Sequence, residues 1–274
     1  MINRCYCMDN LELMKQMEDE NVDLIYIDPP FSTGGTFKTS DGKVAFEDDY
    51  TLNELIEFLK PRIKEMHRIL KPTGSFYLHG DYRFIPYMRV ECDKIFGINN
   101  FRNEIIVRTK TFRAKNIYSR QHDTILVYSK SDKYHYYEPE KAKYKPRILN
   151  NIEKDEFGWF YWTSGGSIKG KKIKNKKRYI EPTMDFAMGD IWEDIILYNG
   201  GKEYKYPTQK PTALLERVIK SSSNKGDIVA DFFCGSGSTG VVAKELGRNY
   251  ILCDINPRAI EISEQRLKEV SDND

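Results

Sequence analysis

Two short segments of the chain carry side chains suited to catalysis, and each follows an apolar run. The first is Asp28-Pro29-Pro30-Phe31, directly after residues 23–27. A carboxylate and a proline carbonyl can accept hydrogen bonds from both N–H groups of an exocyclic amine, which makes its nitrogen a better nucleophile. Proline locks φ and keeps the turn rigid, while the ring of Phe31 can stack on a base extruded from a duplex. This segment predicts catalysis by positioning an amino group.

The second segment is a glycine turn. An apolar run over residues 227–233 leads into Gly235, Gly237 and Gly240 and then a helical pattern, and Asp254 follows 19 residues after Gly235. This is the context of a nucleotide-binding β-α-β unit, in which the later acid binds ribose hydroxyls. The competing interpretation is a structural turn with a surface aspartate.

Asp231 discriminates between cofactors, because it lies immediately before the glycines. A dinucleotide pyrophosphate would be repelled there, whereas the sulfonium and amino groups of S-adenosylmethionine would be attracted by several kcal/mol outside bulk water. The turn also lacks the Gly-Lys-Ser/Thr ending of a phosphate-binding loop, so an ATPase has little support. The predicted cofactor is S-adenosylmethionine.

These turns need a scaffold, and the flanking patterns supply one. We expect buried strands over residues 23–27, 75–78, 227–233 and 250–253, and helices over 52–66, from Pro211 onward and over 258–270. Alternating strands and helices predict a doubly wound, mostly parallel Rossmann-like α/β sheet. Ligands of such sheets bind at the carboxyl ends of the strands, so both turns are expected at one edge. His79 and Asp81 fall at this edge too, where an ordinary turn is an equally good interpretation.

Residues 138–206 interrupt this rhythm and are expected to form an insertion between the two parts of a catalytic domain, 1–137 and 207–274. From Lys141 to Arg178 there are 12 Lys or Arg against three acids, with aromatic residues at Trp159, Tyr161 and Trp162. A solvated surface is the simplest interpretation, but a basic, aromatic patch also suits DNA phosphates. The candidate contacts are Lys169, Lys171, Lys172, Lys174, Lys176, Lys177 and Arg178.

Composition excludes several classes of protein. Charged residues make up 31% and hydrophobic ones 40% of the chain, which is typical of a globular protein. No apolar run approaches the roughly 18 residues of a membrane span, and the amino terminus does not resemble a secretory signal. The five cysteines are scattered without CxxC pairs, so we expect reduced thiols, no metal site and a cytoplasmic protein.

Three motifs together resemble a known family. DPPF, the DFFCGSGSTG turn and YPTQKP at residues 206–211 are similar to motifs of the S-adenosylmethionine-dependent DNA amino-methyltransferases. The order, with DPPF before the glycine turn and a basic region between them, resembles the beta group. The resemblance covers most of the chain, while residues 138–206 match only as a region of variable content, the target-recognition region.

The resemblance implies roles for individual residues. The DPPF residues Asp28, Pro29, Pro30 and Phe31 match the catalytic motif. The cofactor-binding positions are Asp9, Thr208, Lys210, Pro211, Asp231, Phe232, Gly235, Gly237 and Asp254. Asp9 matches the position that contacts the adenine of the cofactor. Two residues depart from the family pattern: Met8 stands where the family usually has glycine before this aspartate, and Phe31 stands where it often has tyrosine, which keeps the stacking ring and loses a hydroxyl.

The target base is predicted by association. In the resembling family Asp at the first motif position usually accompanies adenine and Ser accompanies cytosine, so Asp28 predicts transfer to the 6-amino group of adenine in double-stranded DNA. Cytosine N4, RNA or protein amide acceptors, and a silent nucleic-acid-binding module remain alternatives. Ring-carbon methylation needs a cysteine after a proline, and no cysteine here follows one. A homodimer and a cognate restriction endonuclease are family-level expectations.

Overall fold

The computed structural model describes residues 1–31, 34–38, 44–109, 114–137, 153–162, 167–168, 171–172, 176–180, 188–197 and 209–270. The chain divides into two compact units. The first contains Met1–Tyr137 together with Asp190–Asp274, and the second contains Glu138–Gly189. Both the DPPF segment and the glycine turn belong to the first unit.

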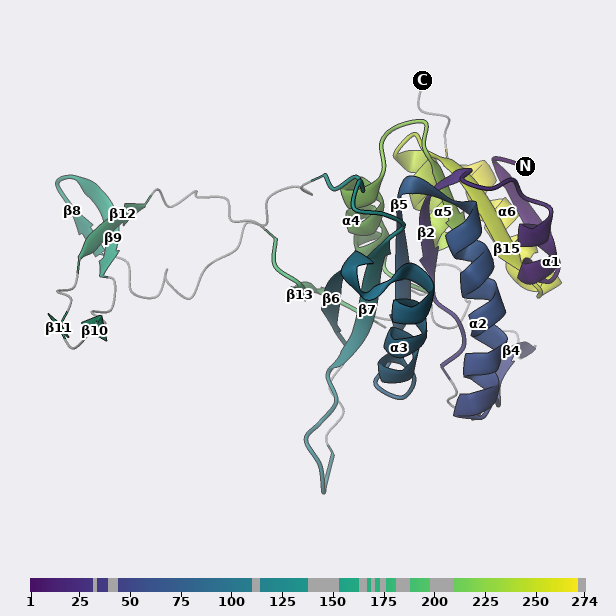
Figure 1. The fold of residues 1–274 in the computed structure, drawn as a ribbon, viewed down its shortest axis with the longest axis horizontal. Helices are drawn as coiled ribbons and strands as arrows, with labels where there is room; N and C mark the ends of the chain where they lie inside the picture. Colours follow the sequence, from purple (N-terminus) through teal and green to yellow (C-terminus); the bar gives the residue numbers. More distant parts are fainter. Residues whose placement is uncertain are drawn as a thin grey trace. The chain divides into compact units, whose positions relative to one another are not determined.

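The first unit is built on an eight-stranded sheet (Figure 1). In spatial order its strands are β1 (Arg4–Cys7), β15 (Asn249–Asp254), β14 (Ile228–Asp231), β2 (Val22–Ile27), β5 (Leu70–Gly80), β7 (His122–Ser129), β6 (Phe101–Arg108) and β13 (Ile191–Ile196). Successive strands from β1 to β5 in this order are parallel. Strand β7 is antiparallel to both its neighbours, and β13 is parallel to β6. The predicted mostly parallel sheet is confirmed.

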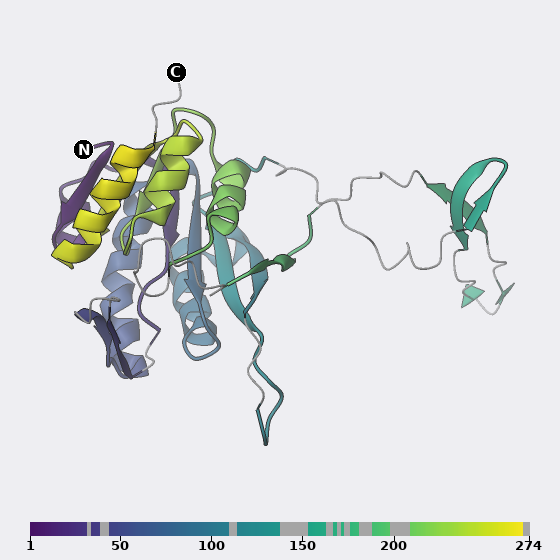
Figure 2. The ribbon, with the colours of Figure 1, turned by 180° about the vertical axis from the view of Figure 1, so that it is seen from behind.

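Helices cover both faces of the sheet, as Figures 1 and 2 show from opposite sides. Helices α2 (Leu52–Ile69) and α3 (Ile85–Phe96) lie on one face, and α4 (Thr212–Ser222), α5 (Ser238–Glu245) and α6 (Pro257–Glu269) lie on the other. The short helix α1 (Asn10–Lys15) packs against α2. A 3-10 turn (Ile98–Asn100) precedes β6, and β3 (Gly35–Lys38) pairs with β4 (Val44–Asp48). The described residues contain no helix long and apolar enough to cross a membrane.

Helix α2 illustrates how the sequence specifies these elements. Thr51 and Glu54 form a reciprocal capping box that satisfies backbone donors at its start. Its apolar side chains recur at three- and four-residue spacing and are fully buried in the core, at Leu55, Leu59, Ile63 and Met66. Burial of each contributes roughly 1.5–3 kcal/mol. The helix ends at Ile69, where the backbone extends directly into β5.

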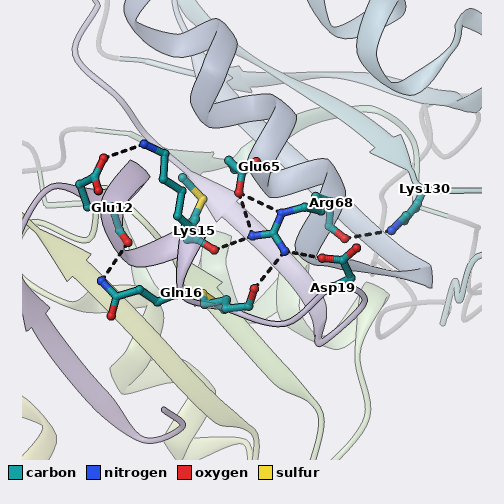
Figure 3. Close-up of polar contacts among 9 residues, drawn as sticks. Glu12, Lys15, Gln16, Asp19, Glu65, Arg68 and Lys130 are labelled. Atoms are coloured by element: carbon teal, nitrogen blue, oxygen red, sulfur yellow. Dashed lines mark hydrogen bonds and ion pairs between the residues drawn. The ribbon is translucent and has the colours of Figure 1, made fainter.

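A half-buried arginine ties α2 to its neighbours (Figure 3). The Arg68 guanidinium donates to the carbonyl oxygens of Met14 at 2.6 Å and Met17 at 2.9 Å, and it pairs with Asp19. The Arg68 carbonyl accepts a hydrogen bond of 3.1 Å from Nζ of Lys130, just after β7. These contacts hold α1 and α2 in place beside the strands that carry the site.

The second unit is small and antiparallel. Strand β9 (Gly158–Trp162) pairs with β8 (Glu153–Asp155) and β12 (Lys177–Ile180), and β10 (Ser167–Ile168) pairs with β11 (Lys171–Lys172). This unit ends at Gly189, whereas the insertion was predicted to extend to residue 206. The difference arises because β13 pairs with β6 and so joins the sheet of the first unit.

Candidate active site

Parallel pairing brings the two motifs to one edge of the sheet. Strand β2 lies between β14 and β5, and β14 lies beside β15. Asp231 and Asp254 are the last residues of β14 and β15, Asp28 directly follows β2, and His79 lies near the end of β5. All four are therefore at the carboxyl edge, where open α/β sheets bind their ligands.

The glycine turn depends on glycine at more than one position. Gly235 and Gly237 have φ of +50° and +74°, a region that residues with a Cβ rarely adopt. A Cβ on Gly237 would lie 2.5 Å from Oγ of Ser263, and one on Gly240 would lie 2.5 Å from Cδ1 of Leu252. The third glycine thus allows α5 to pack closely on β15, as the nucleotide-binding pattern predicts.

Two acidic side chains accept hydrogen bonds from the residues of this turn. Asp231 is 4% exposed and accepts hydrogen bonds from Oγ1 of Thr239 at 2.6 Å and from the backbone N–H of Phe233 at 3.0 Å. Burial raises the pKa of Asp231 to about 7, with a further contribution from the charges of Asp28 and Asp254. Burial also raises the pKa of Asp254, whose Oδ2 accepts from the backbone N–H of Gly235 at 2.9 Å. The edge is therefore electronegative.

Asp28 has a different environment on each oxygen. Nζ of Lys210 lies 2.5 Å from Oδ2, and Nδ1 of His79 lies 4.0 Å from Oδ1. Oδ1 is buried and has no hydrogen-bond partner among the described residues. Lys210, which the resemblance assigns to the cofactor, thus contacts the DPPF carboxylate in this structure. Pro211, the next residue, caps the start of α4 rather than forming its first turn.

The rest of the DPPF segment packs against the core. Pro29 is buried and Pro30 is half-buried. The Phe31 ring stacks on Phe84 with centroids 5.5 Å apart, and its backbone N–H donates to Oδ2 of Asp48 at 3.2 Å. The core therefore holds the segment in place.

Asp9 lies at the start of α1, where its Oδ1 accepts from the backbone N–H of Leu11 at 2.8 Å. Nη2 of Arg62 donates to Oδ2 of Asp9 at 2.6 Å, a contact that the sequence does not reveal. Nδ2 of Asn10 donates to the carbonyl of Phe232 at 2.7 Å, which links this helix to the glycine turn. The Phe232 side chain is fully buried in the core, so its backbone is the part that can face a cofactor.

The remaining predicted positions belong to the second unit or fall outside the described residues. Thr208, Lys169 and Lys174 fall outside the described residues. Lys171 and Lys172 form β11, and Arg178 is in β12. Lys176 and Lys177 are exposed, and Nζ of Lys177 pairs with Oδ2 of Asp155 at 2.8 Å. The described residues contain no cluster of three or more His, Cys, Asp and Glu side chains suited to a metal ion.

The residues at the carboxyl edge fit S-adenosylmethionine. Burial and the charges of Asp28 and Asp254 raise the pKa of Asp231, and a cationic ligand relieves the cost of ionising it. Asp254 accepts one backbone hydrogen bond on each oxygen, from Gly235 and Asn256, and retains lone pairs for ribose hydroxyls. A dinucleotide, whose pyrophosphate is anionic, fits this edge poorly.

The fold and the arrangement of acidic residues and glycines at the carboxyl edge of the sheet are those of a Rossmann-like α/β enzyme. A family model described as DNA methylase matches residues 22–265. The chain belongs to this DNA methylase family, and the predicted S-adenosylmethionine-dependent DNA methyltransferase is confirmed.

Comparisons with individual proteins agree with this assignment. The Type II methyltransferase M.HpaI of Haemophilus parainfluenzae is 31% identical over 97% of this chain and 74% of its own length. The DNA adenine methyltransferase YhdJ of Escherichia coli strain K12 is 31% identical over 96% of this chain and 82% of its own. A putative DNA modification methylase of Thermus thermophilus, solved with S-adenosyl-L-methionine, has a similar fold. Its TM-score is 0.59 at 20% identity, covering 97% of this chain and 93% of that one.

Proposed function

We propose that this enzyme transfers a methyl group from S-adenosylmethionine to the 6-amino group of adenine in double-stranded DNA, at specific sites. The observation that carries the proposal is the buried Oδ1 of Asp28, which lacks a hydrogen-bond partner among the described residues and lies at the same edge as Asp231 and Asp254. An unsatisfied buried acceptor is costly unless a ligand uses it. The similarity to a relative named DNA adenine methyltransferase supports adenine as the base.

The residues of the site divide the task. The Asp28 carboxylate and the Pro29 carbonyl accept hydrogen bonds from the two N–H groups of the amine, and Phe31 contacts the base. Asp231, with Gly235 and Gly237, holds the methionine end of the cofactor. Asp254 binds its ribose, and Asp9 binds its adenine. When bound, the cofactor supplies an electrophilic methyl group, and the protein contributes mainly orientation.

The second unit acts in target recognition. Its exposed Lys176 and Lys177 bind DNA phosphates, which give affinity without sequence information. The enzyme works in the cytoplasm as a homodimer, together with a restriction endonuclease of matching specificity. Sedimentation with and without DNA tests the dimer.

The test is direct. Unmethylated DNA is incubated with the enzyme and S-adenosylmethionine, digested to nucleosides and analysed by mass spectrometry, with N6-methyladenine as the expected product. Asp28→Ala should lower turnover by orders of magnitude yet leave cofactor affinity by calorimetry nearly unchanged, because the lost contact matters most as the amine attacks.

The matched control is Asp23→Ala, which removes a carboxylate from the opposite end of β2, where Asp23 accepts from the backbone N–H of Ile228. This variant should lose stability while keeping turnover per folded molecule. N4-methylcytosine as the sole product would overturn the choice of base. An active Asp28→Ala enzyme would remove Asp28 from the reaction.

A further inference from the structure

A fully buried histidine lies behind the proposed catalytic carboxylate. His79 is 0% exposed near the end of β5. Its Nδ1 is 2.8 Å from the hydroxyl of Tyr26 and 4.0 Å from Oδ1 of Asp28, and its Nε2 is 3.5 Å from Oδ2 of Asp123. The Phe31 ring lies beside it, with centroids 6.2 Å apart. His79 is thus flanked by two carboxylates, from the DPPF turn and from β7.

Two atoms in this cluster are unsatisfied. Oδ1 of Asp28 and Nε2 of His79 are both buried without a hydrogen-bond partner among the described residues. Leaving a buried polar atom unpaired typically costs about 1–3 kcal/mol, so sites that keep such atoms use them for something else. Their position directly behind the proposed amine acceptor points to the handling of a proton.

Methyl transfer leaves a proton to dispose of. When the amine nitrogen bonds the methyl carbon, the bond from that carbon to the cofactor's sulfur breaks and the nitrogen becomes positively charged. The neutral product forms only after one N–H bond breaks. Asp28 is the nearest proposed acceptor, but Nζ of Lys210 is 2.5 Å from its other oxygen. The ion pair uses the negative charge of Asp28, so restoring it after each reaction requires that the proton move on.

We propose that His79 takes up this proton from Asp28, acting as a positioning residue, with Tyr26 and Asp123 holding it for that role. The amine N–H bond breaks as an O–H bond forms on Asp28. That O–H bond then breaks as an N–H bond forms on Nδ1 of His79. This step requires the 4.0 Å between Oδ1 and Nδ1 to shorten to hydrogen-bond distance in the complex with DNA, while the Tyr26 hydroxyl turns from donor to acceptor. The imidazolium lies between two carboxylates. The inference rests on the proposed role of Asp28.

The arrangement requires one particular tautomer. Nδ1 must be free of hydrogen and accept from the Tyr26 hydroxyl, while Nε2 carries the hydrogen toward Asp123. Nitrogen-15 NMR of the imidazole distinguishes the two tautomers in the protein without cofactor or DNA, and His79→Gln assigns the signal. We expect the Nε2–H form. A neutral Nδ1–H form would overturn the proposal, because Nδ1 would have no lone pair for the proton.

Kinetics provide the second test. His79→Gln should lower the single-turnover rate of DNA methylation roughly 100-fold with unchanged cofactor affinity. The matched control is His67→Gln. His67 is half-buried on α2, where its ring packs edge-on against Phe96 at 4.9 Å. This variant should keep the wild-type rate.

Asp123→Asn keeps the test valid if His79→Gln does not fold, because it is isosteric and removes only the charge that stabilises the imidazolium. It should lower the single-turnover rate in the same direction. Unchanged rates in folded His79→Gln or Asp123→Asn protein would overturn the relay while leaving the methyltransferase assignment intact. Failure of the wild type to methylate any DNA would overturn the proposed function instead. The nitrogen-15 NMR measurement of the tautomer would still test the arrangement of His79 in that case.

Discussion

At the residue scale, the ionised Asp231 carboxylate favours cofactor binding and lowers the stability of the folded protein. Burial raises the pKa of its carboxyl to about 7, above the unfolded value, so its contribution to stability is present at low pH and is lost as pH rises through 7. Asp231→Asn should therefore make the cofactor-free protein more stable than wild type, by up to about 4 kcal/mol above pH 7. Urea denaturation at pH 5 and pH 8 measures this, and the gap should widen with pH.

The same titration predicts the pH dependence of cofactor affinity. A cationic cofactor favours the ionised carboxylate, so wild-type affinity for S-adenosylmethionine by calorimetry should rise with pH up to about 7 and then level off. Asp231→Asn should bind more weakly and without this rise. A stability gap and an affinity that do not vary with pH would show that Asp231 does not titrate in this range.

At the element scale, the start of α5 depends on Gly237. Its φ of +74° and the distance of 2.5 Å that would separate an added Cβ from Oγ of Ser263 both disfavour a side chain. Gly237→Ala should destabilise the protein by more than the roughly 1–2 kcal/mol of the left-handed conformation alone, and it should weaken cofactor binding. Thermal unfolding and calorimetry measure the two effects.

Gly226→Ala is the control for this prediction. Gly226 has a φ of +86° but no atom within 4 Å of the Cβ position, so its substitution measures the conformational cost without the clash. It should leave cofactor affinity unchanged. Equal destabilisation by the two substitutions would mean that Ser263 moves aside at no cost.

At the scale of the whole molecule, the basic second unit should supply sequence-independent DNA affinity. Lys176→Gln should weaken binding to all DNA and reduce the slope of log affinity against log salt by about 0.9. Lys177→Gln should do the same and also destabilise the unit, because Nζ of Lys177 pairs with Asp155 and lies 4.1 Å from the centre of the Phe160 ring. Fluorescence anisotropy at several salt concentrations measures both.

Asp155→Asn separates the two roles of Lys177, since it breaks the ion pair and keeps the positive charge. It should retain the wild-type salt slope. If both lysine variants retain wild-type affinity and slope, the basic surface is only solvated and does not bind DNA.

Much of this protein was determined by the sequence alone, because local patterns carry the information. The spacing of Leu55, Leu59 and Ile63 predicts α2, since one face of a helix must be apolar to pack on a sheet. The glycine turn and the DPPF segment, each following an apolar strand, predict the carboxyl-edge site, because parallel strands end together. Motif residues matched to a family give the chemistry.

Only the tertiary structure decided which distant residues meet. Strand β5 pairs with β7, which brings Asp123 to His79, and the chain around Lys210 returns to Asp28 across 182 residues. The pairing of β13 with β6 likewise ends the second unit at Gly189. Strand order and register arise from the packing of the whole sheet, and the burial that raises the pKa of Asp231 depends on every element around it. Neither property is encoded in a local pattern of residues.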